Sequence, residues 1–255
     1  MGTIVITGGA AGIGRATALL AAQRGYDTAI MDLPAAEPAA KEVVTEVEGY
    51  GRRAVALAAD VTVERDVVGS FAQVVERLGP ITGLVNGAGL LYSAKCTEID
   101  AAEVRATMAV NVTGLMLCSR EAARLMMHSR GGHGGCIVNI SSMAATIGGR
   151  HRGAVYAASK AAVDAYTTGM AKEVAAEGIR VNAVRPGLVA TGLTAALLED
   201  PARRQAIEES IPLGRVGAPA DVAEAALWLL AEKNNWISGA HLDVSGGGFF
   251  VSGSF

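Results

Sequence analysis

Short apolar runs rich in β-branched residues alternate along this chain with longer segments whose apolar residues recur every three or four positions. A strict alternation of strands and helices predicts a parallel sheet, because each parallel crossover takes a helix that packs on a face of the sheet. The expected strands are residues 3–7, 27–32, 53–60, 81–86, 136–140, 179–184 and 240–244. The expected helices are residues 14–25, 35–51, 64–79, 101–129, 154–178 and 219–233. The predicted fold class is therefore α/β, a Rossmann-like doubly wound sheet of about seven parallel strands with helices on both faces.

The composition indicates one globular domain spanning residues 1–255, since hydrophobic residues make up 51% and no linker interrupts the pattern. Lys and Arg total 22 against 25 Asp and Glu, which gives no basic surface for nucleic acid. Three cysteines without CxxC spacing predict no disulfide framework, and the histidines form no metal-binding pair. The sequence has no apolar run of membrane-spanning length, and its first residues read as a strand, so we expect a cytoplasmic protein without a membrane segment.

A glycine-rich turn, "TGGAAGIG" at residues 7–14, joins the first strand to the first helix. Glycines at Gly8, Gly12 and Gly14 would let the backbone turn tightly and approach a pyrophosphate at the helix N-terminus. Their spacing departs from the general GxGxxG fingerprint, and flexible loops can look similar. The context supports a dinucleotide site, because the second strand ends in an acidic residue, Asp32, eighteen residues after Gly14. The alternative for Asp32 is a helix N-cap or a turn residue before Pro34.

The carboxylate of Asp32 also bears on which dinucleotide is bound. It could accept hydrogen bonds from both adenosine ribose hydroxyls and would repel a 2′-phosphate. Leu33 and Ala11 offer no basic partner for such a phosphate, whereas Arg15 is the one nearby residue that could. NAD is therefore the expected cofactor, and NADP is less favoured.

A phenol and an ammonium lie four residues apart in "YAASK", at Tyr156 and Lys160. A phenol with a pKa of about 10 is a poor base at neutral pH, but a lysine on the same helix face favours the phenolate. Such a pair could exchange a proton with an alcohol oxygen held by a hydroxyl from Ser141 or Ser142, which follow a predicted strand. The alternative is a core aromatic beside a solvated lysine.

Taken in order, these motifs resemble the short-chain dehydrogenase/reductase family in its single-domain form. The matching stretches are "TGGAAGIG" (7–14), "DV" (60–61), "NGAG" (86–89), "NVTG" (111–114), "NISS" (139–142), "YAASK" (156–160), "NAVRPGLVAT" (182–191) and "ISGAHLDVSGG" (237–247). The resemblance implies that Tyr156 is the general acid/base, and that Lys160 lowers its pKa and binds the nicotinamide ribose. It further implies that Ser142 holds the substrate oxygen and that Asn111 carries a water relay to Lys160.

The same resemblance implies a set of cofactor-binding residues. Asp60 and Val61 would surround the adenine, Asn86 and Ala88 would follow the ribose, and Val189 and Thr191 would meet the carboxamide side of the nicotinamide. The full expected set is Gly8, Gly12, Ile13, Gly14, Asp32, Asp60, Val61, Asn86, Ala88, Tyr156, Lys160, Pro186, Val189 and Thr191, with no metal ligand.

Three positions leave alternatives open. Gly87 stands where the family usually has a second asparagine, which would loosen the fourth strand locally. The interval from Ser142 to Tyr156 is one residue longer than is commonest, so Ser141 competes with Ser142 for the substrate oxygen. Asn111 could instead bond a neighbouring carbonyl at a helix irregularity.

The expected reaction interconverts a secondary alcohol and a ketone, and the motifs are compatible with sugars, polyols, steroids and 3-hydroxyacyl thioesters. Substrate loops are expected at residues 89–100, 143–155 and 188–215, the last as a charged candidate lid. Within the second loop, Arg150, His151 or Arg152 would select an acidic or polyhydroxylated substrate, unless these side chains are simply solvated.

Alternative functions are a non-catalytic dinucleotide-binding redox sensor and an NADPH-dependent 3-oxoacyl thioester reductase. A serine hydrolase is disfavoured, because the sequence has no GxSxG motif. The resemblance implies a homotetramer, with an interface helix around Trp228. The tail that carries Phe249, Phe250 and Phe255 is expected to pack on the protein itself or on a neighbouring subunit.

Overall fold

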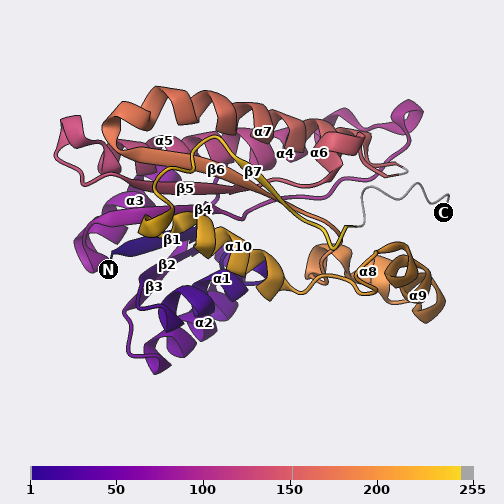
Figure 1. Ribbon diagram of the computed structural model, residues 1–255, viewed down its shortest axis with the longest axis horizontal. Coiled ribbons are helices and arrows are strands. Elements are labelled where there is room, and N and C mark those ends of the chain that lie inside the picture. Colours follow the sequence, from indigo (N-terminus) through magenta and orange to yellow (C-terminus); the bar gives the residue numbers. More distant parts are fainter. Residues whose placement is uncertain (1, 151, 248–255) are drawn as a thin grey trace.

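A seven-stranded parallel sheet forms the centre of the computed structural model, which describes residues 2–150 and 152–247. Within those residues the strand order is β3-β2-β1-β4-β5-β6-β7, so the α/β Rossmann-like prediction is confirmed (Figure 1). The order reverses between β1 and β4, which creates the crevice where doubly wound sheets bind ligands. The strands are β1 (Thr3–Thr7), β2 (Asp27–Asp32), β3 (Ala54–Ala58), β4 (Ile81–Asn86), β5 (Gly135–Ile140), β6 (Ile179–Pro186) and β7 (His241–Val244).

Helices cover both faces of this sheet (Figure 1). On one face lie α1 (Gly12–Gln23), α2 (Glu37–Gly49) and α10 (Pro219–Leu230). On the other face lie α3 (Glu64–Leu78), α5 (Leu115–Met126) and α7 (Ala154–Val174), with α4 (Ala101–Met108) in contact with α7. Three further helices, α6 (Ala144–Ile147), α8 (Ala195–Leu198) and α9 (Pro201–Ser210), follow β5 and β6 in the chain and lie beyond the carboxyl edge of the sheet (Figure 1).

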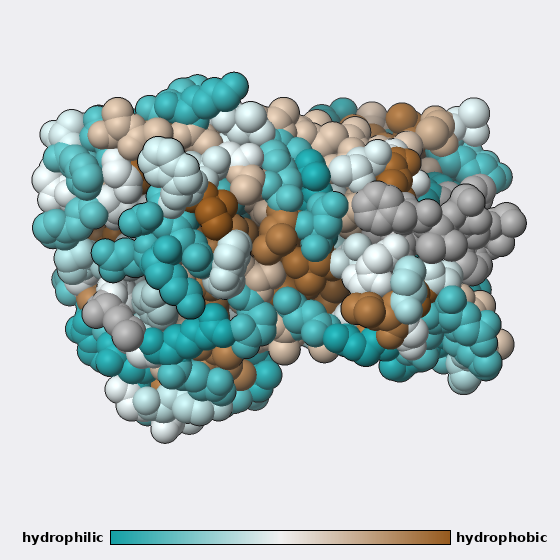
Figure 2. Space-filling model, viewed as in Figure 1, coloured by the Kyte–Doolittle hydropathy of each residue, from teal (hydrophilic) through white to brown (hydrophobic). Residues whose placement is uncertain are grey.

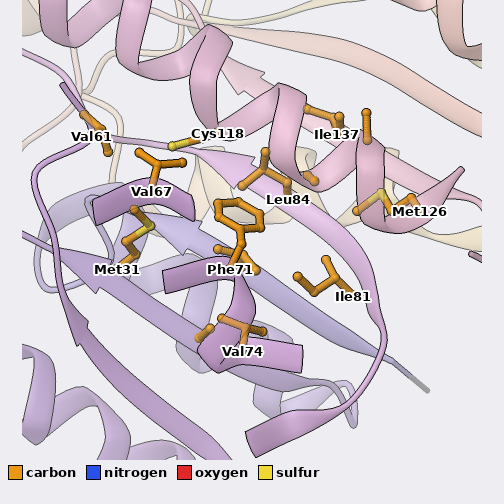
Figure 3. Packing of buried hydrophobic residues seen from close by; sticks show 14 of the residues in the cluster. Met31, Val61, Val67, Phe71, Val74, Ile81, Leu84, Cys118, Met126 and Ile137 are labelled. Atoms are coloured by element: carbon orange, nitrogen blue, oxygen red, sulfur yellow. The ribbon is translucent and has the colours of Figure 1, made fainter. Parts of the chain in front are cut away.

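The sheet separates two apolar cores. Every residue of β1 is buried, because a central strand with helices on both faces exposes neither side to water. Figure 3 shows the ring of Phe71, from α3, at the centre of one core with Leu84 and Met31 close to it. The second core is built from β1, α1, α2 and α10. Burial on both faces fixes the sheet, and the sheet in turn fixes the loops at its carboxyl edge.

The helix expected over residues 101–129 is interrupted. α4 ends at Met108, residues Ala109–Gly114 form a π-helical turn, and α5 begins at Leu115. Such turns are rare inside α-helices and are frequent at functional sites. This one contains Asn111, whose side chain bonds to a different loop, so the turn positions that residue.

The segment 188–215, expected as a loop, contains two helices. α9 begins at Pro201, and the carboxylate of Asp200 accepts hydrogen bonds from the main-chain N–H groups of Ala202 and Arg203. Ile207 and Ile211 of this segment form a small apolar cluster with Val216, the residue that follows it. The candidate lid is therefore a structured element with its own packing.

Candidate active site

The glycine-rich turn packs backbone against backbone. A Cβ on Gly14 would lie 2.1 Å from the carbonyl oxygen of Gly8, and Gly8 itself has a φ of +65°. A Cβ on Gly8 would lie 2.8 Å from the main-chain nitrogen of Ala88, in the loop after β4. These contacts leave no room for side chains, so the turn presents bare main chain at the start of α1, as a pyrophosphate site requires.

Asp32 is tied to this turn from the end of β2. Its Oδ2 accepts a hydrogen bond of 2.9 Å from the main-chain N–H of Ala10, and its Oδ1 accepts one of 2.8 Å from Leu33. The N-cap alternative is wrong, because the short 3₁₀ turn that follows has Leu33 at its N-cap and no side-chain cap. Arg15 donates to both oxygens of Glu46 on α2, at 2.7 and 2.8 Å, so its guanidinium is already paired with a carboxylate.

The residues expected around the adenine make structural contacts. Oδ1 of Asp60 accepts hydrogen bonds from the main-chain N–H and the hydroxyl of Thr62, both of 2.8 Å. Val61 is buried against the π-helical turn, where a Cβ on Gly114 would lie 2.7 Å from its Cγ2. Both residues therefore shape the loop after β3.

The side chain of Asn86 lies inside the protein, at the end of β4. Its Nδ2 donates hydrogen bonds of 2.9 Å to Asn139 Oδ1 and to Ser119 Oγ. Among the described residues its buried Oδ1 has no hydrogen-bond partner. A contact between Asn86 and a ribose would thus be made by the main chain. Gly87 sits tightly beside it, since a Cβ there would lie 2.8 Å from the carbonyl oxygen of Thr7.

Lys160 is a buried lysine. Its side chain donates a 2.8 Å hydrogen bond from Nζ to the carbonyl of Ile140, at the end of β5, and the residue is only 4% exposed. Burial lowers the pKa of Lys160 to about 8, and the carboxylate of Asp164, one turn further along α7, acts in the opposite direction. The solvated-lysine alternative is therefore wrong for this chain.

Tyr156 lies on the same helix, and Lys160 Nζ is 5.8 Å from the centroid of its ring. Burial raises the pKa of the Tyr156 phenol, and a hydrogen bond with Ser142 opposes that rise. The ammonium lies over the ring and donates one hydrogen bond to the carbonyl of Ile140.

The structure distinguishes between the two serines after β5. Ser142 bonds to the phenol of Tyr156, and its Oγ accepts a 3.1 Å hydrogen bond from the main-chain N–H of Ala144. Ser141 is buried, and its hydroxyl donates to the carbonyl of Lys160 at 3.2 Å. Ser142 is therefore the serine that lies with Tyr156.

Asn111 joins three parts of the site. Its Nδ2 donates to the carbonyl of Leu90 at 2.9 Å and to Ser159 Oγ at 3.0 Å, and its Oδ1 accepts from the N–H of Leu90 at 2.7 Å. Asn111 thus does bond a carbonyl from a helix irregularity, but that carbonyl belongs to Leu90 in the loop after β4 and not to a neighbour in the helix. The site of Lys160 is adjacent, because a Cβ on Gly89 would lie 3.3 Å from Asn111 Oδ1 and 3.6 Å from Lys160 Nζ.

Ser159 received no role from the sequence. Its hydroxyl accepts from Asn111 and donates a 2.7 Å hydrogen bond to the carbonyl of Tyr156, so it connects the π-helical turn to α7. Its place inside "YAASK", directly before Lys160, is the signal that could have identified it.

The segment after β6 forms the last part of the site at the carboxyl edge of the sheet. Pro186 ends β6, Val189 is buried, and Thr191 lies over the glycine-rich turn, where a Cβ on Gly12 would meet Thr191 Cγ2 at 3.3 Å. A pocket of about 530 Å³ lies between this segment and α1. A second pocket, of about 670 Å³, lies between α10, β7 and the turn after α9, and Figure 2 shows apolar groups gathered over that part of the surface.

Some expectations fall outside the described residues, namely those for His151 and for the tail with Phe249, Phe250 and Phe255. Over residues 2–150 and 152–247, no helix is long and apolar enough to cross a membrane. The same residues contain no group of three or more His, Cys, Asp or Glu side chains that could hold a metal ion.

Comparisons with known proteins agree with this geometry. A family model described as enoyl-(acyl carrier protein) reductase matches residues 8–248. The uncharacterized oxidoreductase YgfF of Escherichia coli is 42% identical over 97% of this chain and 100% of its own length. L-rhamnose 1-dehydrogenase (NAD(P)(+)) of a Sphingomonas species is 36% identical over 96% of this chain and 95% of its own. The structure of a short-chain type dehydrogenase/reductase from Mycobacterium ulcerans superposes with a TM-score of 0.91 at 33% identity, covering 99% of this chain and 91% of that one.

Proposed function

Because this chain belongs to the short-chain dehydrogenase/reductase family of NAD(P)-dependent oxidoreductases, we propose that it interconverts a secondary alcohol and a ketone, with NAD as the preferred cofactor. The observation that carries the proposal is the arrangement of Ser142, Tyr156 and the buried Lys160 at the carboxyl end of β5. A protein that only sensed the cofactor would need no proton-transfer group at this place.

In the oxidation direction, the hydroxyl of Ser142 holds the alcohol oxygen and the phenolate of Tyr156 takes its proton. NAD bound at this edge would supply the hydride acceptor for the carbinol carbon and an added positive charge. The carbon–oxygen bond becomes a carbonyl, so one hydride and one proton leave the alcohol and the ketone remains. In the reverse direction, the protonated phenol of Tyr156 donates to the carbonyl oxygen.

Lys160 supports this proton transfer by its charge. With a pKa of about 8, its ammonium is mostly protonated at neutral pH and stabilises a phenolate on the same helix face. Burial works against the phenolate of Tyr156, so an added positive charge from the bound cofactor has a large effect in this low-dielectric site. Asn111 bonds to Leu90 and to Ser159, the residue directly before Lys160, and so ties the loop after β4 to α7.

The cofactor would lie along the carboxyl edge of the sheet. The bare main chain from Gly8 to Gly14 fits a pyrophosphate, because any Cβ on Gly8 or Gly14 would meet backbone atoms. Asp32 would receive the adenosine ribose hydroxyls, and Ala88, Ile13, Val189 and Thr191 would line the path toward Tyr156.

The preference for NAD rests on the charge of Asp32 and on the pairing of Arg15 with Glu46. Asp32→Asn keeps an oxygen that can accept from Ala10 and removes the charge. Even in water, two unit charges ~4 Å apart repel by ~1 kcal/mol, so the ratio of kcat/KM for NAD over NADP should fall at least about fivefold in this variant. The assay follows the absorbance of reduced cofactor with a panel of secondary alcohols. A wild-type enzyme that turns over faster with NADP would contradict the proposal for the cofactor and leave the alcohol chemistry standing.

The same proposal includes a homotetramer. Trp236 is 97% exposed and Trp228, on α10, is 43% exposed, and large aromatic side chains open to water are typical of subunit contacts. Light scattering on purified protein tests this directly. A monomeric mass would refute it.

A further inference from the structure

Large apolar side chains are open to solvent on the three segments that follow β4, β5 and β6. They are Leu90 and Leu91 after β4, Ile147 in α6 after β5, and Leu193 and Leu197 after β6. These strands are neighbours in the sheet, so their carboxyl ends meet at the edge that carries Tyr156. In Figure 1, α6 and the pair α8 and α9 lie beyond this edge of the sheet, on its two sides. We call these five residues the apolar rim.

The segments of the apolar rim are anchored to the proposed catalytic residues. Both the N–H and the carbonyl of Leu90 bond to Asn111, and the preceding residue, Gly89, lies beside Lys160 Nζ. Ala94, in the same segment, donates a 3.0 Å hydrogen bond to the carbonyl of Arg152, close to the start of α7. The leucines after β4 therefore stand directly next to the reacting centre.

The other two segments are equally close in the chain. Ile147 follows Ser142 by five residues, and α6 packs on α7, which carries Tyr156. Leu193 follows Thr191 by two residues, and Thr191 lies against Gly12 in the glycine-rich turn. A substrate that reached Ser142 and Tyr156 would pass between these three segments.

Charged side chains on these segments bond mainly to their own neighbours. Lys95 pairs with Glu98 at 2.9 Å, and the carboxylate of Asp100 caps α4. On the lid, Arg204 pairs with Glu208 at 3.0 Å. Arg150, one of the residues expected to select a polar substrate, is also engaged. A site for a sugar or polyol needs several uncommitted polar groups that converge on the hydroxyls, because each unpaired hydroxyl is costly to bury.

On the basis of the proposed alcohol oxidation, we infer that the substrate is a hydrophobic secondary alcohol or its ketone. The carbinol lies at Ser142 and Tyr156, and an apolar body, an alicyclic ring or a medium-length alkyl chain, lies against the apolar rim. Binding such a body removes both its surface and that of the leucines from water, which favours binding in proportion to the apolar area covered.

The test is a comparison of kcat/KM for alcohols that each carry a secondary hydroxyl and differ in the rest of the molecule. The apolar series is 2-butanol, 2-octanol and a decalin alcohol, and the polar series is D-glucose, L-rhamnose and sorbitol. We expect kcat/KM to rise at least roughly tenfold from 2-butanol to 2-octanol, since each added methylene gains apolar contact. We expect the polar series to react more slowly than either.

Substitutions in the apolar rim test whether these residues cause the expected rise in kcat/KM. Leu91→Asn and Leu193→Asn should each lower kcat/KM for 2-octanol several-fold and change that for 2-butanol little, with the Kd for NADH unaffected. Val75→Asn, in the C-terminal half of α3, removes an exposed valine at the opposite edge of the sheet and is the matched control. The Kd of 2-octanol in its complex with enzyme and NADH, followed by NADH fluorescence, should rise in the same two variants, which gives a readout independent of turnover.

The possible outcomes distinguish the hydrophobic substrate from the proposed alcohol dehydrogenase activity on which it rests. Best turnover with an aldose or polyol, still lost in Tyr156→Phe, would overturn the hydrophobic substrate and leave the dehydrogenase standing. Equal kcat/KM for 2-butanol and 2-octanol, or unchanged values in both leucine variants, would also overturn it. No Tyr156-dependent turnover with either series would overturn both proposals.

Discussion

Gly14 is the position where the smallest added group should have the largest effect on cofactor binding. A Cβ there would lie 2.1 Å from the carbonyl oxygen of Gly8 and 2.9 Å from the Cα of Gly9. Both are main-chain atoms, and 2.1 Å falls about 1.3 Å short of an ordinary contact of 3.4 Å. The glycine-rich turn must therefore move by about 1 Å in Gly14→Ala, and misplacements of this size cost on the order of 100-fold where geometry decides binding or rate.

The assay is a titration of the variant with NADH, followed by NADH fluorescence, together with thermal unfolding. We expect the Kd for NADH to rise about 100-fold, with the Tm lowered as well. Gly69→Ala is the control, because Gly69 lies within α3 on its solvent-exposed face and a Cβ there would meet nothing within 4 Å. That substitution should stabilise the protein by about 0.5–1 kcal/mol and leave NADH binding unchanged.

The two variants add the same methyl group, so their difference isolates the contact with Gly8. If Gly14→Ala bound NADH within about threefold of wild type while Gly69→Ala behaved as described, the turn would not be the pyrophosphate site. An equal loss in both variants would instead point to a general effect of the added methyl groups.

Two further predictions concern stability. Lys160 has a pKa of about 8 in the folded protein against 10.5 for a solvated lysine, so the unfolded chain holds more protons between these values and stability should rise with pH across that window. Lys160→Met removes the buried ammonium, so in urea titrations at pH 7 the free energy of unfolding of the variant should exceed that of wild type by about 2 kcal/mol. The stability of the variant should not rise above pH 8, and its turnover should be lost. A variant less stable than wild type would contradict this prediction. Phe71→Ala empties the centre of one core and should lower the free energy of unfolding by about 3–5 kcal/mol, and a loss below about 1 kcal/mol would show that the core repacks freely.

The parallel sheet could be predicted because its signals are local. The bounds of β1, β2 and β4 match the predicted ranges, since each strand is a short apolar run that ends where the chain turns. The choice of Ser142 over Ser141 could not be made from spacing alone. It depends on which hydroxyl the turn after β5 directs toward Tyr156, and that turn is held by main-chain hydrogen bonds from Ser141 and Met143 to β6.

Interactions across the chain account for what sequence patterns missed. The π-helical turn is accompanied by bonds from Asn111 to Leu90, twenty-one positions away, which helical spacing cannot reveal. The side chain of Asn86 is drawn into the protein by Asn139 and Ser119, two other elements of the fold. The pKa of the Tyr156 phenol is set first by burial, a quantity that exists only once the chain is packed.

The central claim is that the phenol of Tyr156 exchanges the proton of the reaction, and one pair of variants on the same helix tests it. Tyr156→Phe removes that hydroxyl, whereas Tyr166→Phe removes a hydroxyl that bonds to Ser119 and packs against the core beneath α7. Initial rates of NADH formation from a secondary alcohol are compared for both variants after each is shown to bind NADH. We expect Tyr156→Phe to lose at least about 100-fold in kcat, since general acid–base groups typically contribute that much, and Tyr166→Phe to keep nearly full activity. A Tyr156→Phe enzyme that binds NADH and retains wild-type kcat would contradict the account.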